Sequence, residues 1–172
     1  ASAIPDMVYT LAEKFWPGPL TMVLKKSDVV PLGTTGGLNT VAVRMPSHPI
    51  ALEMIRAGGG YIAAPSANTY GRPSPTLASH VAYDMDGIIP MILDGGECKF
   101  GVESTVISIT NDSIMLLRPG SITVEALKEI CPNVKIASAV KEELKQGETV
   151  LSPGMKYKHY SPKAKVYILK GS

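Results

Sequence analysis

The first hydrophobic pattern of the chain is helical. Between residues 5 and 15, apolar side chains recur every three or four positions, which is the spacing that gathers them on one face of a helix. Pro5 suits a first helical turn, where its missing N–H removes no hydrogen bond. The segment WPGPL that follows Phe15 is typical of a helix end. We therefore predict an amphipathic helix over residues 5–15.

Short apolar runs bounded by Gly, Pro and polar clusters predict strands in the rest of the chain. These runs cover residues 21–25, 40–45, 61–65, 87–96, 104–109 and 113–120. The last two alternate around NDS, which is typical of a β-hairpin. Helical spacing predicts further helices at residues 46–59, 75–85 and 121–130. Ser47 is the expected N-cap of the first of these, and Thr123 with Glu125 gives an imperfect capping pattern in the last.

Strands and helices are mixed along the chain without strict alternation. This order favours an α/β fold with a mixed sheet over a doubly wound parallel sheet, and residues 1–136 are expected to form that domain. Residues 137–163 are polar and lack a sustained apolar period, which predicts an extended linker. Residues 164–172 begin a new apolar strand and are expected to start a second domain. We expect the chain to be a segment trimmed at both ends.

Composition supports a folded domain and narrows its partners only a little. The chain has 172 residues, of which 45% are apolar and 19% charged, so one ordinary domain can bury a sizeable core. The net charge of +2 is too small to require nucleic acid or an anionic membrane. No apolar run approaches the roughly 20 residues of a membrane span, and no secretory signal is visible. Cys98 and Cys131 stand apart, which favours a cytoplasmic protein with free thiols over a zinc site.

Polar side chains stand at the ends of several predicted strands. Thr40 begins the strand that Arg44 ends, and Arg118 ends the second strand of the predicted hairpin. An arginine that closes an apolar run needs an anionic partner if it points inward, so both arginines are candidate clamps for a carboxylate or a phosphate. The alternative for Arg44 is the solvent face of an edge strand. The alternative for Arg118 is a turn that leads into a helix.

The stretch PSANTYGRPSPT, residues 65–76, is rigid and polar. Ser66 and Asn68 alternate, so an extended backbone would point both to one side, where a hydroxyl and an amide can bind a phosphate, a ribose or an amino acid. The simpler alternative is a turn in which both side chains bond their own backbone. Ser74 is a candidate N-cap of the helix that follows, and Ser104 stands at the start of a strand.

Common signatures of nucleotide and hydrolase sites do not occur in the sequence. It has no P-loop, no Rossmann glycine fingerprint, no nucleophile elbow and no pair of carboxylates placed for acid–base work. His48, His80 and His159 lie in unrelated contexts, and His48 and His80 are discounted as catalytic groups. The segment KYKHYSP places two tyrosines among cations in the predicted linker, where they either cover a bound base or amino acid or pin the linker to the domain.

Six short motifs occur together and in a characteristic order. They are FWPGPLT, TVAVRMPSHP, APSAN, GVESTVI, LRPG and KYKHYSP. With them the chain resembles the threonylcarbamoyl-AMP synthase family, the YrdC-type domain, in its longer form with a linker and a Rossmann-like second domain. The resemblance implies a twisted, open, mixed sheet with helices around a concave basic cavity. It also implies synthesis of threonylcarbamoyl-AMP and pyrophosphate from L-threonine, bicarbonate and ATP, for the modification of tRNA.

The resemblance further implies roles for individual residues. Those expected to hold L-threonine are Arg44, the Ala64 backbone and Ser104. Those expected to hold ATP are Thr40, Ser66, Asn68, Ser74, Arg118 and Tyr160, the last as a lid from the linker. Mg²⁺ is expected with ATP, a tRNA threonylcarbamoyl transferase is the expected downstream partner, and no nucleophilic catalytic residue is implied. The family's K-x-R motif has no counterpart in these 172 residues, so we expect weak or absent ATP turnover from them alone.

Two other interpretations stay open at this point. One is a YrdC-type domain that handles carbamoyl-adenylate, as in hydrogenase maturation proteins, although their acylphosphatase and zinc-finger segments do not occur in this sequence. The other is a non-catalytic module that binds double-stranded RNA, which a basic concavity would permit; steep salt dependence of RNA binding would favour it.

Overall fold

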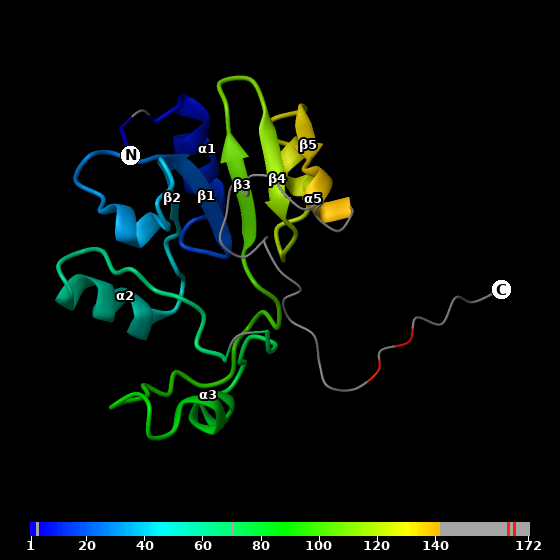
Figure 1. Ribbon diagram of the computed structural model, residues 1–172. Coiled ribbons are helices and arrows are strands. Elements are labelled where there is room, and N and C mark those ends of the chain that lie inside the picture. Colours follow the sequence, from blue (N-terminus) through cyan, green and yellow to red (C-terminus); the bar gives the residue numbers. More distant parts are fainter. Residues whose placement is uncertain (3, 70, 142–164, 166, 168–172) are drawn as a thin grey trace. The chain divides into compact units, whose positions relative to one another are not determined.

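The chain divides into two compact units. The computed structural model describes residues 1–172 except 3, 70, 142–164, 166 and 168–172 (Figure 1). The first unit comprises residues 1–64 and 100–156, and the second comprises residues 65–99 and 157–172. The elements of the first unit are α1 (Asp6–Phe15), β1 (Leu20–Lys25), η1 (Leu32–Thr35), β2 (Thr40–Val43), α2 (Pro49–Ala57), β3 (Thr105–Ile109), β4 (Ile114–Arg118), α4 (Val124–Lys128), β5 (Val134–Ile136) and α5 (Ser138–Lys141). The second unit contains α3 (Ala78–Met85).

The first unit is built on a five-stranded sheet of mixed direction. The strand order is β2-β1-β3-β4-β5. β1 pairs antiparallel with β2 and parallel with β3, while β4 pairs antiparallel with β3 and parallel with β5. The sheet is open because β2 and β5 at its two ends do not pair with each other. The mixed, open α/β fold expected from the sequence is therefore confirmed.

Alternation along the strands gives the sheet two apolar faces. The larger core cluster, to which α1 and α4 contribute, contains Val8, Leu11, Leu20, Met22, Leu24, Ile107, Ile114, Leu116, Leu127 and Cys131. The smaller cluster contains Val23, Val106 and Leu117. Met22 and Val23 belong to different clusters, as the two-residue period of a strand requires. Each large side chain buried in this way stabilises the fold by about 1.5–3 kcal/mol relative to exposure.

The segment WPGPL joins α1 to β1 through a tight turn. Trp16 Nε1 donates a 2.7 Å hydrogen bond to Leu20 O, and Gly18 N donates one of 2.8 Å to Met45 O. A Cβ on Gly18 would lie 2.3 Å from Phe15 O, so a larger residue does not fit there. The first of the six motifs is thus explained by the packing of a turn against the chain that follows β2.

The two predicted serine caps are wrong, whereas the threonine cap is confirmed. The N-cap position of α2 is His48 and that of α3 is Leu77, and neither side chain forms a capping hydrogen bond. Helix α2 starts with Pro49, which needs no N–H partner, so the N-cap position lies one residue beyond Ser47. Residues 75–77 stay outside α3, which separates Ser74 from it. Thr123 accepts a 3.3 Å hydrogen bond from the amide of Ala126 at the start of α4.

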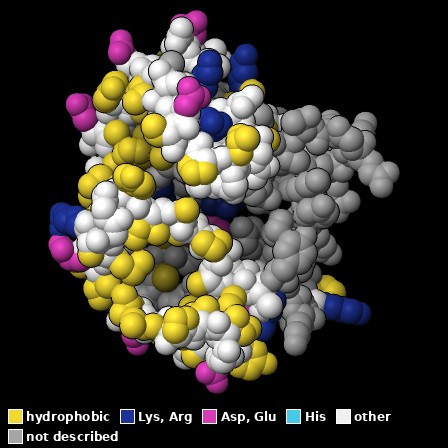
Figure 2. All heavy atoms as spheres, turned by 60° about the vertical axis from the view of Figure 1, so that its left-hand side comes forward, with side chains coloured by type: hydrophobic (Ala, Val, Ile, Leu, Met, Phe, Trp, Pro, Cys, Tyr) yellow, Lys and Arg dark blue, Asp and Glu magenta, His cyan; other side chains and the backbone are white. Residues whose placement is uncertain are grey.

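Two predicted strands are wrong. Residues 61–65 and 87–96 contain no strand, and no described strand pairs with them. Their apolar side chains remain at the surface, with Tyr61 85% and Met91 70% exposed. Figure 2 shows hydrophobic side chains gathered over much of one face of the molecule. An apolar run predicts burial, but it does not specify the strand with which it would pair. For this reason the two strand predictions were wrong.

Three short elements of the structure, η1, β5 and α5, were not predicted. β5 has three residues, too few for a periodic signal, and is defined by its pairing with β4. α5 occupies residues 138–141, the beginning of the segment predicted as an extended linker. The rest of that linker lies outside the described residues, as does the strand predicted at 164–172 apart from Lys165 and Tyr167. The domain boundary at residue 136 stays a prediction.

Candidate functional site

Ser104 and Arg118 form a polar cluster where β3 begins and β4 ends. Because these strands are antiparallel, the start of one meets the end of the other at the same edge of the sheet. Arg118 donates from Nε and Nη2 to the carbonyl oxygen of Ser104, at 3.1 and 2.9 Å, and from Nη2 to its Oγ at 3.1 Å. The Ser104 and Thr21 hydroxyls lie 2.7 Å apart in a further hydrogen bond. Ser104, which was expected to bind threonine, and Arg118, which was expected to bind ATP, are thus hydrogen-bonded to each other.

The backbone around this cluster is packed too closely for side chains. A Cβ on Gly120, in the motif LRPG, would lie 2.4 Å from Thr105 N and 2.5 Å from Glu103 O. These are backbone atoms, which cannot move aside as the end of a flexible side chain can. Thr105 Oγ1 donates to Ile122 O at 2.9 Å and accepts from Ile122 N at 3.0 Å, which ties the chain beyond Gly120 to β3. The position of Ser104 is therefore fixed by its surroundings.

Arg44 lies at the same end of the sheet as this cluster. β2 runs antiparallel to β1, with Val43 opposite Met22, so Arg44 follows β2 toward the end of the sheet at which β1 begins. Its side chain is exposed. An exposed guanidinium beside a strand end can bind a carboxylate through two parallel hydrogen bonds.

Thr40 lies at the opposite end of β2. It pairs with Lys25, the last residue of β1, and it lies four positions from Arg44, which corresponds to about 13 Å along a strand. Thr40 lines a shallow depression of about 340 Å³ together with Lys25, Ser108 and Thr110. The structure therefore does not bring Thr40 together with Ser104 and Arg118 at one sheet end.

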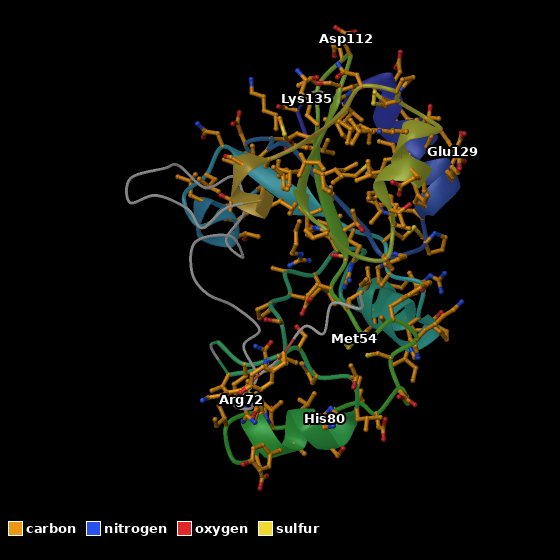
Figure 3. All side chains as sticks on the ribbon, turned by 90° about the vertical axis from the view of Figure 1, so that its right-hand side faces the viewer. Met54, Arg72, His80, Asp112, Glu129 and Lys135 are labelled. Carbon is orange, nitrogen blue, oxygen red and sulfur yellow. The ribbon has the colours of Figure 1, made fainter. Side chains whose placement is uncertain are left out.

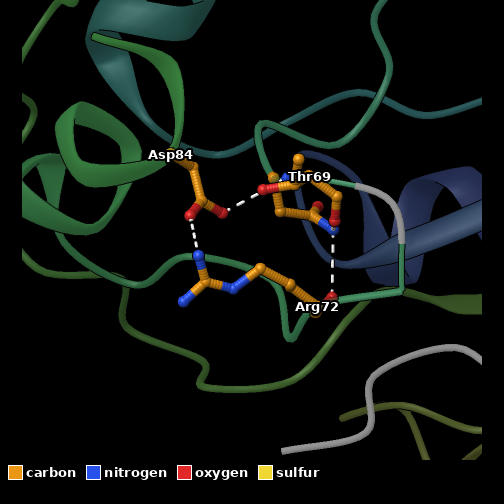
Figure 4. Close-up of polar contacts among 4 residues, drawn as sticks. Thr69, Arg72 and Asp84 are labelled. Atoms are coloured by element: carbon orange, nitrogen blue, oxygen red, sulfur yellow. Dashed lines mark hydrogen bonds and ion pairs between the residues drawn. The ribbon is translucent and has the colours of Figure 1, made fainter.

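The loop of residues 65–76, in the second unit, is held by its own side chains (Figure 4). Asn68 donates from Nδ2 to the carbonyl oxygens of Thr69 and Arg72, both at 3.0 Å. The Asn68 Oδ1 atom is buried and has no hydrogen-bond partner among the described residues. The Nδ2 group of Asn68 thus stabilises the loop, as the turn interpretation expected. Its Oδ1 atom can still accept a hydrogen bond.

An ion pair that sequence reasoning missed joins this loop to α3. Arg72 Nη1 pairs with Asp84 Oδ1, and the amide of Thr69 donates to Asp84 Oδ2 at 3.2 Å. The Arg72 guanidinium also lies 5.1 Å from the centre of the Tyr83 ring. Figure 3 shows Arg72 in the loop and His80 on the helix. The signal available in the sequence was a charged residue inside a proline-rich turn, but nothing there identifies its partner twelve positions away.

The environment of Asp84 keeps its carboxyl group ionised. Partial burial alone would raise its pKa, but the hydrogen bond from the Thr69 amide and the charge of Arg72 outweigh that effect, so the pKa lies below its ordinary value. At neutral pH, Asp84 is therefore a charged acceptor that holds two separate points of the loop.

The remaining predicted residues lie in several places. Ala64 and Ser66 are exposed on either side of the boundary between the two units, and Ser74 is half-buried in the second unit. Tyr160 lies outside the described residues. His80 Nδ1 accepts a 3.4 Å hydrogen bond from the amide of Thr76, which is a structural role.

Neither a metal cluster nor a membrane helix occurs in the part of the chain that the structure describes. No group of three or more His, Cys, Asp or Glu residues there is placed to hold a metal ion. No helix there is long and apolar enough to cross a bilayer.

Known proteins are similar to this chain over nearly its whole length. Residues 1–120 match the Sua5/YciO/YrdC family model, described as telomere recombination, and residues 122–172 match the C-terminal domain of threonylcarbamoyl-AMP synthase. The chain is 52% identical over 171 residues to the threonylcarbamoyl-AMP synthase of Pyrococcus abyssi, covering 99% of this chain and 50% of that protein. It is 49% identical over 169 residues to the protein of the same name from Bacillus subtilis, covering 98% and 48%.

A solved structure agrees with the fold. The crystal structure of Pyrococcus abyssi Sua5 complexed with L-threonine has a TM-score of 0.89 and 53% sequence identity, and the match covers 96% of this chain and 48% of that chain. The YrdC-like fold expected from the six motifs is thereby confirmed. The chain spans about half the length of the curated relatives it matches.

Proposed function

We propose that this chain is part of an L-threonylcarbamoyladenylate synthase. The proposal starts from the family, because the chain belongs to the Sua5/YciO/YrdC family. Such an enzyme is a nucleotidyltransferase that uses L-threonine, bicarbonate and ATP. The observation that carries the proposal is the extent of the likeness, since relatives named threonylcarbamoyl-AMP synthase are about half identical over almost every residue of the chain. The polar cluster at the sheet edge supports it with chemistry suited to an amino acid.

The threonine site of this proposal is built on the Ser104 cluster. Arg44 binds the carboxylate of L-threonine, since a guanidinium fork matches a carboxylate in geometry and charge. Ser104 Oγ, held between Thr21 and Arg118, offers a fixed hydroxyl to the polar part of the amino acid. The backbone of Ala64 completes the site. Fixed partners matter because a group that is already ordered loses little entropy when a ligand binds.

The ATP site of this proposal draws on the remaining polar residues. Arg118 supplies positive charge for the phosphates, and the hydroxyls of Ser66 and Ser74 supply hydrogen bonds from a proline-rich loop. Asn68 keeps Oδ1 as an acceptor, while its Nδ2 holds the loop. Thr40 and Tyr160 are assigned to the same nucleotide, Tyr160 as a flat cover from the linker.

The proposed reaction needs positioning more than it needs a catalytic base. The amine of threonine attacks the carbon of bicarbonate or CO₂, and a carbamate forms, with loss of water in the case of bicarbonate and release of the amine proton to solvent in the case of CO₂. A carbamate oxygen then bonds to the α-phosphorus of ATP, the bond from that phosphorus to the bridging oxygen breaks, and pyrophosphate leaves. Holding the partners in line is worth effective molarities on the order of 10⁵ M. Positive charge from Arg118 stabilises the developing charge on the phosphates.

Mg²⁺ enters this proposal only as the ion that ATP carries. The described residues offer no carboxylate-rich cluster for it. Mg²⁺ in nucleotide sites is commonly held by the substrate phosphates and water with one or two protein ligands. We place the enzyme in the cytoplasm, with a tRNA threonylcarbamoyl transferase as the consumer of its product.

The test is the release of pyrophosphate by the full-length protein that contains this chain. With ATP, L-threonine and bicarbonate together, we expect continuous release. Omission of either threonine or bicarbonate should reduce it to background, because the carbamate then cannot form. Release that does not depend on threonine contradicts the proposal. Tight, salt-dependent binding of double-stranded RNA with no binding of ATP or threonine would favour a non-catalytic RNA module instead.

A further inference from the structure

The second unit contains a set of polar contacts around Asp84 that has no role in the proposed function so far. The Asp84 carboxylate, near the end of α3, contacts the loop of residues 65–76 at two points, Thr69 and Arg72. A carboxylate near the C-terminal end of a helix is unfavourable for the helix itself, because that end carries partial negative charge. The stability of α3 therefore does not account for Asp84.

Burial distinguishes this ion pair from Lys14–Glu129 and from Arg56–Glu53. The side chain of Asp84 is only 8% exposed, whereas both partners of Lys14–Glu129 and of Arg56–Glu53 are at least 40% exposed. Exposed pairs contribute little, but a carboxylate that is mostly buried requires its partners. The Asp84 carboxylate therefore depends on Thr69 and Arg72 for its polar partners.

The pair fixes the segment between the two serines assigned to ATP. Asn68 bonds the Arg72 carbonyl oxygen, Arg72 pairs with Asp84, and Asp84 accepts from Thr69, so the contacts close a ring (Figure 4). The Tyr83 ring lies against the guanidinium as a second contact from α3. Among its described residues the loop contains no helix or strand, so its order comes from this ring, from the prolines beside it and from the hydrogen bonds of Thr76 with His80 and Cys98.

We propose that Arg72 and Asp84 are positioning residues for ATP: they hold the loop of residues 65–76 in its binding conformation before the nucleotide arrives. The inference rests on the proposed function, since it is that function that assigns Ser66 and Ser74 to ATP. Neither Arg72 nor Asp84 needs to touch the nucleotide. Because they order the loop in advance, less conformational entropy is lost when ATP binds.

The test uses the full-length protein with Asp84→Asn, which keeps the shape of the side chain and removes its charge. Pyrophosphate release gives KM for ATP and KM for threonine separately, and calorimetry gives the Kd of ATP without turnover. We expect KM and Kd for ATP to rise about tenfold, because the loop must then be ordered during binding, while KM for threonine and kcat stay unchanged. Arg72→Gln should have the same effect, and the double variant should add little, because the two residues act through one contact.

The matched control is Asp86→Asn, which removes a negative charge two positions away on an exposed side chain. Its kinetics should equal those of the wild type. The proposal is overturned if Asp84→Asn binds ATP as Asp86→Asn does, or if both KM values rise together, which would indicate damage to the fold. If Asp84→Asn does not fold, Arg72→Gln makes the same test, since its side chain is 41% exposed. A wild type that binds ATP but releases no pyrophosphate overturns the enzyme function alone, because the ATP affinity of the variants still tests the loop.

Discussion

Ser104, in the proposed threonine site, is held by hydrogen bonds from two side chains. Its hydroxyl lies between Thr21 Oγ1 and Arg118 Nη2, and its carbonyl oxygen accepts from the same guanidinium. With two partners on one hydroxyl, the side chain has little freedom to rotate. In the proposed site, Thr21 therefore acts on threonine indirectly, by holding Ser104 in one orientation.

Replacement of Thr21 by valine tests this arrangement. Valine has the shape of threonine but cannot bond Ser104, so we expect weaker threonine binding, unchanged ATP binding and a loss of about 1 kcal/mol in the free energy of unfolding. Calorimetric titration with each substrate and chemical denaturation give the three quantities. Thr34→Val, on an exposed side chain of η1, is the control and should change none of them. Unchanged threonine affinity in a folded Thr21→Val protein would remove Thr21 from the site.

The ionisation of Asp84 should make the free energy of unfolding depend on pH. Burial alone would raise its pKa, but the Thr69 amide and Arg72 hold it below the ordinary value of about 3.9. A carboxyl group whose pKa is lowered by folding stabilises the native state fully above the ordinary pKa, and this contribution is lost as the pH falls through the lowered pKa. The difference in unfolding free energy between wild type and Asp84→Asn should thus be constant near neutral pH and shrink in acid below about pH 4. Denaturant titrations across this range measure it, and a difference that grows in acid would contradict the assignment.

Among the helices and strands, the hydrophobic pattern predicted those that are determined by residues close together in the sequence. Helix α1, strand β1 and the hairpin of β3 and β4 carry their own periodicity or turn, and each was found. Residues 61–65 have the composition of a strand, yet pairing depends on a partner that no local pattern specifies. Strand β5 shows the reverse case, because its three residues become a strand only through pairing with β4.

Close packing between elements gives the sharpest prediction for stability. Gly120 follows β4 and lies against the backbone at the start of β3, where a Cβ would meet three backbone atoms at 2.4–2.8 Å. We expect Gly120→Ala to lower the free energy of unfolding by about 3 kcal/mol or more, since these atoms cannot move aside. Thermal or chemical unfolding measures the loss. Gly33→Ala is the control, because nothing lies within 4 Å of its added Cβ, and equal stability of the two variants would contradict this packing.

In the molecule as a whole, one contact near the site is a consequence of the predicted hairpin, and another has no signal in the sequence. The meeting of Ser104 with Arg118 follows from the hairpin, which brings the start of one strand to the end of the next. The pairing of Arg72 with Asp84 could not be predicted, because a loop carries no period that sets which helix residue it meets. The role of Tyr160 stays a prediction, since that residue lies outside the described part of the chain.

The proposed function makes this chain part of an enzyme that joins threonine, bicarbonate carbon and AMP. Its most direct test is the mass of the nucleotide product that the full-length protein makes from isotope-labelled bicarbonate, L-threonine and ATP. We predict one adenylate that contains both threonine and the labelled carbon, formed with an equal amount of pyrophosphate and only when all three substrates are present. An adenylate without threonine, or ADP and phosphate in its place, would contradict the claim.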